Sequence, residues 1–136
     1  MAISDFFAKV LKAPLNNIRW SWGAVRPDGC VILRLWQDEV CKIGDTIYVT
    51  VQWEDHLWGG DEESRNGRNE RSEHIKLILA GTKAFAVVQQ AVDVSASPRE
   101  IKDYMRDSIY SLGNTPLYRD GTTLFPVIGK VPVESI

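Results

Sequence analysis

The chain is poor in the residues that build metal centres and covalent cross-links. It has two cysteines, Cys30 and Cys41, and two histidines, His56 and His74, among 136 residues. Neither cysteine belongs to a CxxC or Cys/His pattern, so a structural zinc site is not expected. Two thiols in a reducing compartment are the favoured interpretation, although the spacing also permits a disulfide. We therefore expect no metal and no cofactor.

Long apolar runs and a large excess of one charge are also missing. No segment approaches the roughly 20 apolar residues of a membrane span, and the N-terminus lacks the cationic start of a signal peptide. A cytoplasmic protein without membrane association is the expectation. The net charge of −2 argues against a generally basic nucleic-acid binder, but it permits a local basic surface.

Catalytic motifs are not found either. The chain has no Gly-x-Ser-x-Gly elbow, phosphate-binding loop or dinucleotide fingerprint. An HNH nuclease needs more histidine and asparagine, and an Asp…Glu-x-Lys nuclease would need lysine two residues after Glu54, where His56 stands. Glu54, Asp55, His56 and Asp61 could hold a metal, but carboxylates in a polar loop are usually solvated. No catalytic residue is assigned.

The patterns that are present predict one α+β domain over residues 1–136, with a compact, partly closed, barrel-like sheet of five to six strands and about three short helices. Strands are expected over 18–25, 30–36, 46–53 and 83–93, and a last hairpin around Asp120 and Gly121. Helices are expected near the N-terminus, over 70–80, and after a capping box at 97–100. The last of these helices is expected to bury Ile101, Tyr104, Met105 and Ile109. The polar residues 54–69 are expected to form a surface loop.

Five tryptophans are the most unusual feature of the composition. Trp20 and Trp22 are expected to share one face of a strand, where filling the core is the favoured role. Trp36 and Trp53 end predicted strands and Trp58 lies in the polar loop, where rings could sandwich a flat ligand. Three arginines at spacings of three, Arg65, Arg68 and Arg71, could contact phosphates, although their acidic neighbours favour a solvated surface.

Several segments resemble small modules associated with HNH endonuclease genes in bacteria. These are residues 69–78 with Gly81, and residues 84–88, 97–101, 129–133, 19–24 and 33–36. The strand order and short helices also resemble the PUA-like group, which includes EVE-type and SRA-type readers of modified bases. That resemblance implies a barrel cleft with aromatic walls that takes up a base. It maps loosely onto Trp22, Trp36, Trp53 and Trp58.

The leading hypothesis is a non-enzymatic binding module that recognises DNA or RNA, with modified bases as candidate ligands, in a restriction or defence context. Trp22, Trp36, Trp53 and Trp58 would bind the base, while Arg65, Arg68 and Arg71 would bind phosphates. A separate endonuclease chain is a possible partner. The alternatives are an accessory protein-interaction subunit and a small metal-dependent nuclease or hydrolase using His56.

Overall fold

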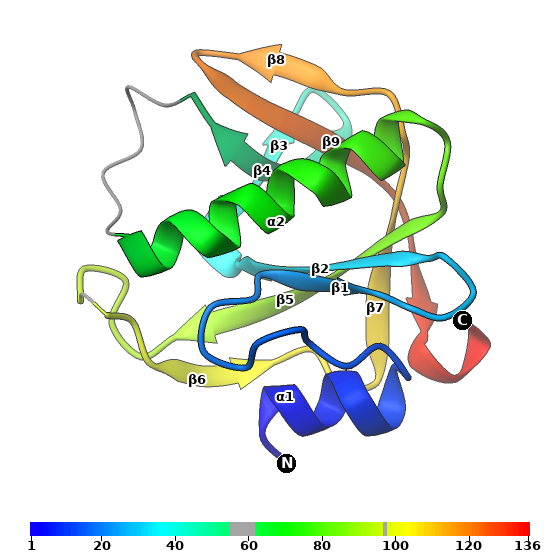
Figure 1. The fold of residues 1–136 in the computed structure, drawn as a ribbon. Helices are drawn as coiled ribbons and strands as arrows, with labels where there is room; N and C mark the ends of the chain where they lie inside the picture. The colour runs from blue at the N-terminus through cyan, green and yellow to red at the C-terminus, as the bar shows by residue number, and fades with distance from the viewer. Residues whose placement is uncertain (55–61, 97) are drawn as a thin grey trace.

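Nine strands form one mixed sheet in the computed structural model, which describes residues 1–54, 62–96 and 98–136 (Figure 1). The main strand order is β1-β2-β5-β7-β9-β4-β3, while β6 pairs with β5 and β8 with β9. The end strands β1 and β3 do not pair, so the sheet is not closed. The strands are β1 (Gly23–Val25), β2 (Val31–Trp36), β3 (Val40–Ile43), β4 (Thr46–Trp53), β5 (Ala84–Ala91), β6 (Ile101–Tyr104), β7 (Ser108–Leu112), β8 (Leu117–Arg119) and β9 (Thr122–Pro132).

The helical segments lie on opposite sides of the sheet. The N-terminus forms α1 (Ile3–Asp5) and the π-helical turn η1 (Phe6–Val10), which lie below β6 and β1 in Figure 1. The long helix α2 (Glu62–Leu79) crosses the other side, between the β1–β2 and β4–β9 parts of the sheet. Within the described residues there are also two 3-10 turns, η2 (Gln37–Glu39) and η4 (Val133–Ser135).

Two buried clusters hold these layers together, one on each face of β2. Ile32 packs on the N-terminal side with Phe6, Phe7 and Leu11. Leu33 and Leu35 pack on the other side with residues of α2 and the far strands, among them Ile75, Ile78, Val49 and Phe125. The two faces alternate because successive side chains of a strand point in opposite directions. The α+β class predicted from the sequence is therefore confirmed, but the sheet has nine strands rather than five or six.

The largest error in the sequence prediction concerns the segment after the capping box. A helix burying Ile101, Tyr104 and Ile109 was expected, but these residues lie in β6 and β7, which pair with β5. Tyr104 packs on Phe6 with ring centroids 5.2 Å apart, and its hydroxyl donates to the Met1 carbonyl at 2.6 Å. Tertiary pairing thus outweighs the local helix signal, as happens commonly with propensities.

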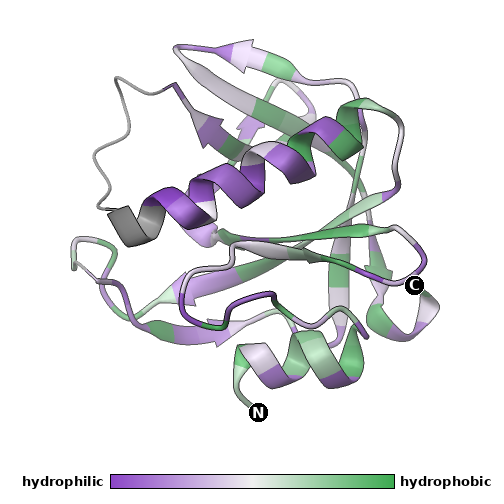
Figure 2. Ribbon diagram, viewed as in Figure 1, coloured by the Kyte–Doolittle hydropathy of each residue, from purple (hydrophilic) through white to green (hydrophobic). Residues whose placement is uncertain are grey.

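The loop predicted over 54–69 is wrong for residues 62–69, since α2 already begins at Glu62, while residues 55–61 lie outside the described part of the chain. After its grey start, α2 is mostly purple in Figure 2, and its residues 65–74 include no large apolar side chain. A helical period is read from apolar positions, and in this helix these come only near the C-terminal end, at Ile75 and Ile78. The sequence signal therefore began about two turns too late.

Several local predictions are confirmed. The strand 46–53 matches β4, and β1 and β2 form the expected antiparallel hairpin, although β1 begins only at Gly23. The last hairpin turns at Asp120 and Gly121, whose φ values of 50° and 76° suit a two-residue primed turn. Cys30 is buried and Cys41 half-buried, and both are free thiols. Among the described helices, none has the length and apolar character needed to cross a membrane.

Candidate functional site

Three tryptophans from separate segments line one pocket of about 400 Å³. Trp22 lies just before β1, Trp36 is the last residue of β2, and Trp53 is the last residue of β4. All three are half-buried, so part of each ring is open to the pocket. A volume of this size falls within the range typical of small-molecule sites. The structure thus brings together three of the four tryptophans proposed from the sequence as ligand-binding.

The fourth, Trp58, lies outside the described residues. Trp20 was expected to share a strand face with Trp22, but residues 18–22 form turns rather than a strand. The two rings are therefore not equivalent, since Trp22 lines the pocket and Trp20 does not. Trp20 is half-buried beside the first half of α2, where its carbonyl oxygen lies close to Gly67.

Arg71 of α2 ties together the two parts of the open sheet beneath the pocket. Its Nη1 donates to the Val51 carbonyl of β4 at 2.7 Å, while Nη2 donates to the carbonyls of Trp22 and Arg34 at 2.9 and 3.0 Å. The Val51 and Arg34 carbonyls lie where β4 extends past β3 and β2 extends past β1, whereas the Trp22 carbonyl also accepts the Arg34 N–H at 2.8 Å. One guanidinium therefore satisfies two main-chain acceptors beyond the paired parts of these strands and adds a donor at a third.

The environment of Arg71 is strongly desolvated. Only 3% of the residue is exposed, and burial lowers its pKa to about 10, against the opposing effect of the Glu39 and Glu70 carboxylates. The guanidinium lies over the Trp22 ring, with Cζ 5.6 Å from the ring centroid. Arg71 was predicted to contact phosphate, but its Nη atoms already serve these carbonyls, which gives it a positioning role in the pocket floor.

A close approach between α2 and the chain before β1 fixes Trp22. A methyl group placed on Gly67 would come within 2.6 Å of the Trp22 ring and of the Trp20 carbonyl oxygen. Gly67 is buried inside α2, where glycine is otherwise unfavourable by about 1 kcal/mol relative to alanine. Its missing side chain is therefore what lets the indole of Trp22 lie against the helix.

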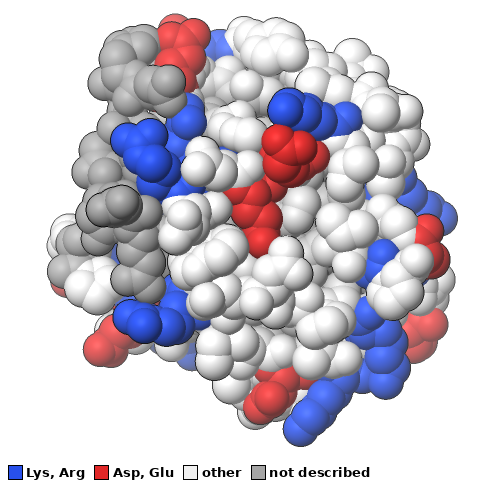
Figure 3. All heavy atoms as spheres, viewed as in Figure 1, with Lys and Arg blue, Asp and Glu red and all other residues white. Residues whose placement is uncertain are grey.

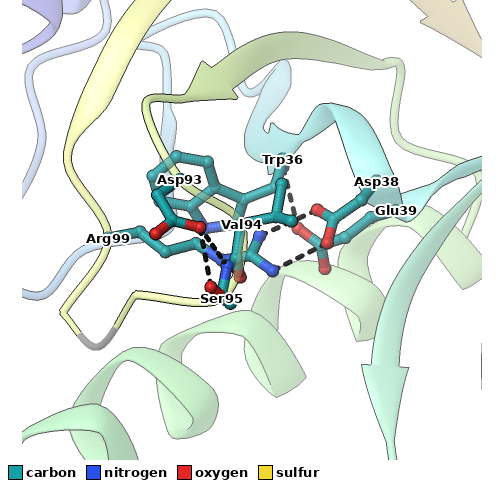
Figure 4. A network of polar contacts seen from close by, with 7 residues as sticks. All are labelled: Trp36, Asp38, Glu39, Asp93, Val94, Ser95 and Arg99. Atoms are coloured by element: carbon teal, nitrogen blue, oxygen red, sulfur yellow. Dashed lines mark hydrogen bonds and ion pairs between the residues drawn. The ribbon is translucent and has the colours of Figure 1, made fainter.

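A polar network surrounds Trp36, which forms another part of the pocket wall (Figure 4). Arg99 donates from both Nη atoms to the Asp38 carboxylate, at 2.8 and 2.7 Å, and its Nε donates to the Val94 carbonyl at 3.0 Å. The same guanidinium lies over Trp36, 5.3 Å from the ring centroid. Sixty-one residues separate Arg99 from Asp38, so this contact joins the segment before β6 to η2 at the pocket rim.

Glu39 fixes the main chain at the start of η2. Its Oε1 accepts the backbone N–H of Trp36 at 2.8 Å, which satisfies a donor at the helix N-terminus. Burial raises the pKa of the Glu39 carboxyl, while the Trp36 N–H and the Arg71 charge act in the opposite direction. The Arg99 guanidinium holds the pKa of Asp38 below its ordinary value. The rim of the pocket thus contains one carboxyl group with a raised pKa, that of Glu39, and one with a lowered pKa, that of Asp38.

The three arginines proposed as phosphate ligands do not occupy equivalent places. Arg65 is exposed near the start of α2, and Arg71 is buried beneath the pocket. Arg68 donates from Nη2 to the Trp53 carbonyl at 2.9 Å and lines a separate polar hollow of about 720 Å³ that also borders Trp53. Contact of Arg65 and Arg68 with phosphate stays a prediction.

Sequence reasoning missed the polar residues that complete the pocket wall. Arg34, Gln89 and Arg99 line it together with the tryptophans. Arg34 and Trp36 are two residues apart on one strand, so the sequence alone predicts that their side chains leave the same face of the sheet. Gln89 is next to Trp36 only because β2 and β5 are parallel neighbours, with Trp36 opposite Gln89. No local pattern indicates that pairing.

The structure offers no support for metal-dependent chemistry within its described residues. There, no group of three or more His, Cys, Asp or Glu side chains is arranged to hold a metal ion. His56 and Asp55, on which the nuclease hypothesis rests, lie outside the described residues. His74 is buried in α2 with no partner for Nδ1 in the described chain, and burial together with the Arg71 charge lowers its pKa to about 4. It is a neutral packing residue at pH 7.

Acidic and basic side chains are interspersed on the visible, described part of the face drawn in Figure 3. No family model matches the chain, and neither curated proteins nor solved structures include one that is significantly similar to it. The class of the protein is therefore defined by its own fold and pocket. It is an α+β protein with an open nine-stranded sheet and a tryptophan-lined pocket at the opening of that sheet.

Proposed function

We propose that the protein is a non-enzymatic binding module that holds a planar heterocyclic ring, of the nucleobase class, in the pocket of Trp22, Trp36 and Trp53. The observation that carries this proposal is the convergence of three indole rings from three separate segments on one pocket of about 400 Å³. Aromatic side chains bind bases by stacking, which contributes about 1–3 kcal/mol for each base.

The polar groups between the rings support a nucleobase rather than a purely apolar ligand. Gln89 is only 2% exposed, and its Oε1 accepts a hydrogen bond from Arg34 Nε at 3.0 Å. A buried amide at the base of an aromatic pocket can read donor and acceptor atoms on the edge of a heterocycle. A PUA-like relationship and a role in reading modified bases for restriction or defence remain part of this proposal.

Binding to oligonucleotides tests the proposal directly. Labelled duplexes and single strands carrying unmodified cytosine, methylated cytosine, hydroxymethylated cytosine or methylated adenine would be titrated with protein at two salt concentrations. We expect saturable binding with quenching of tryptophan fluorescence, and a preference for one base. Absence of binding to every probe would refute the proposal and favour a protein partner, to be sought by pull-down.

Substitution of single tryptophans identifies the site. Trp36→Leu or Trp53→Leu is expected to weaken binding about 5- to 150-fold, the equivalent of about 1–3 kcal/mol of stacking. Trp20→Leu is the matched control, since it removes an indole that is half-buried but outside the pocket. Equal losses in all three variants would show that the pocket is not where the base binds.

A further inference from the structure

The pocket contains more positive than negative side chains. Four arginines line it, together with two carboxylates; these residues are Arg19, Arg34, Arg71, Arg99, Asp38 and Glu39. Two of the arginines have their contacts within the protein. Arg99 forms a two-pronged ion pair with Asp38, and Arg71 donates to three main-chain carbonyls. The remaining positive charges of the pocket are those of Arg19 and Arg34.

Arg34 brings a positive charge to the pocket without a carboxylate partner among the described residues. It is half-buried on β2, and its one hydrogen bond to a side chain joins Nε to the neutral amide of Gln89. Among the residues that the structure describes, no carboxylate lies within ion-pair distance of it, and its Nη atoms have no hydrogen-bond partner. Burial lowers the pKa of Arg34, and its charge adds to the lowering of the Arg71 pKa. An anion in the pocket would relieve both effects.

The guanidinium of Arg34 is held in a fixed place. Gln89 is almost fully buried, so the bond from Arg34 Nε to Gln89 Oε1 fixes one edge of the guanidinium group. The other edge is then available as a planar fork, the geometry that matches two oxygens of a phosphate or carboxylate. Arg34 also borders a second hollow near the N-terminus, where the Asp103 carboxylate is already paired with Arg106 at 3.1 Å.

Trp36 lies two residues after Arg34 on the same strand, so both side chains leave the same face of β2, about 6.7 Å apart along the strand. One strand thus places an anion receptor beside an aromatic platform. A nucleotide has the same arrangement, because its phosphate is one sugar away from its base.

We infer that the pocket recognises a nucleotide rather than a bare base, with Arg34 binding the phosphate attached to the base that stacks on the tryptophans. This inference rests on the function proposed above and adds the anionic group to it. Arg34 would be a specificity-determining residue, positioned by Gln89. Arg34 replaces Arg65 and Arg68 as the principal phosphate ligand of the bound nucleotide.

The test compares a nucleoside with its 5′-monophosphate, using the same base, by tryptophan fluorescence and calorimetry. The base is the one preferred in the oligonucleotide titration, and inorganic phosphate alone serves as a third probe. We expect the monophosphate to bind at least tenfold more tightly than the nucleoside, and its affinity to fall as salt is raised. Inorganic phosphate alone is expected to bind much more weakly than the monophosphate.

Three variants locate the effect. Arg34→Gln should bring the ratio of nucleotide to nucleoside affinity close to one and reduce the salt slope by about one, whereas Arg34→Lys should retain part of the ratio. Lys42→Gln is the charge-matched control on the edge strand β3, away from the pocket, and should leave the ratio unchanged. Thermal melting of each variant shows whether it is folded, and the wild-type ratio stands even if Arg34→Gln does not fold.

The outcomes separate the two proposals. Equal affinity of the wild-type protein for nucleoside and nucleotide would overturn the inference and leave the base-binding function standing. A wild-type ratio that Arg34→Gln retains in a folded protein would overturn the role of Arg34. Failure of both ligands and of every oligonucleotide to bind would overturn the proposed function, and the inference with it.

Discussion

Replacing Arg71 by methionine is expected to destabilise the protein by about 3–5 kcal/mol. Methionine has a similar length and fills much of the same space, but it cannot donate to the carbonyls of Val51, Trp22 and Arg34. The Trp22 carbonyl keeps the Arg34 N–H as a donor, but the carbonyls of Val51 and Arg34 lose theirs, at a cost of about 1–3 kcal/mol each. The sum of about 2–6 kcal/mol is reduced at its upper end because a desolvated charge is removed as well.

Urea unfolding followed by far-ultraviolet circular dichroism measures the change. Lys76→Met on the same helix is the control, since its ion pair with Glu73 is exposed and exposed pairs contribute at most about 1 kcal/mol. Arg71→Lys keeps the charge, but a single ammonium cannot match three acceptors on three segments, so it should recover only part of the loss. If Arg71→Met unfolds cooperatively within 1 kcal/mol of the wild type, the bridging role assigned to Arg71 is wrong.

Three further predictions concern the surroundings of the pocket. Gly67→Ala, which normally stabilises a helix, should here cost about 1–3 kcal/mol in urea unfolding, because the added methyl meets the Trp22 ring; stabilisation, as expected for the exposed neighbour Asn66→Ala, would contradict this packing. The pKa of His74 is lowered from 6.5 to about 4, so between these values the unfolded chain binds the extra proton and wild-type stability should fall by about 3 kcal/mol as the pH drops. His74→Gln should lack that decrease, and an unchanged pH profile would show that His74 is not buried as a neutral group. Asp38→Asn breaks a partly exposed ion pair, so stability should change by less than about 1 kcal/mol, while nucleotide affinity rises because Arg99 loses its counter-charge; weaker binding would show that Arg99 must stay fixed.

Local chemistry in the sequence determined the elements whose signals come from their own residues. The β-branched and aromatic residues of β4 predicted its bounds, and Asp120–Gly121 predicted the last turn because both residues must adopt positive φ. The tryptophans at strand ends were singled out as residues that could meet around a ligand, and Trp36 and Trp53 line one pocket, while their binding of a ligand stays a prediction. These inferences held because strand alternation and turn geometry depend on a few neighbouring residues.

Only the tertiary structure decided what the segment after residue 97 becomes. Its capping signal favours a helix by a small free energy, whereas pairing with β5 and β9 and burial of Tyr104, Ile109 and Leu112 contribute far more. The first half of α2 was missed for a related reason. Its buried residues include Gly67 and Arg71, which a hydrophobic pattern does not count.

The pocket itself also depends on long-range arrangement. Trp36 and Trp53 come from strands that belong to different parts of an open sheet, and the parallel pairing of β2 with β5 places Gln89 beside Arg34. The sequence supplies these residues but not their neighbours, because contacts between distant segments arise from the packing of the whole sheet. Arg71 shows the difference most clearly. The sequence presents it as one of three surface arginines, and the fold buries it against three carbonyls.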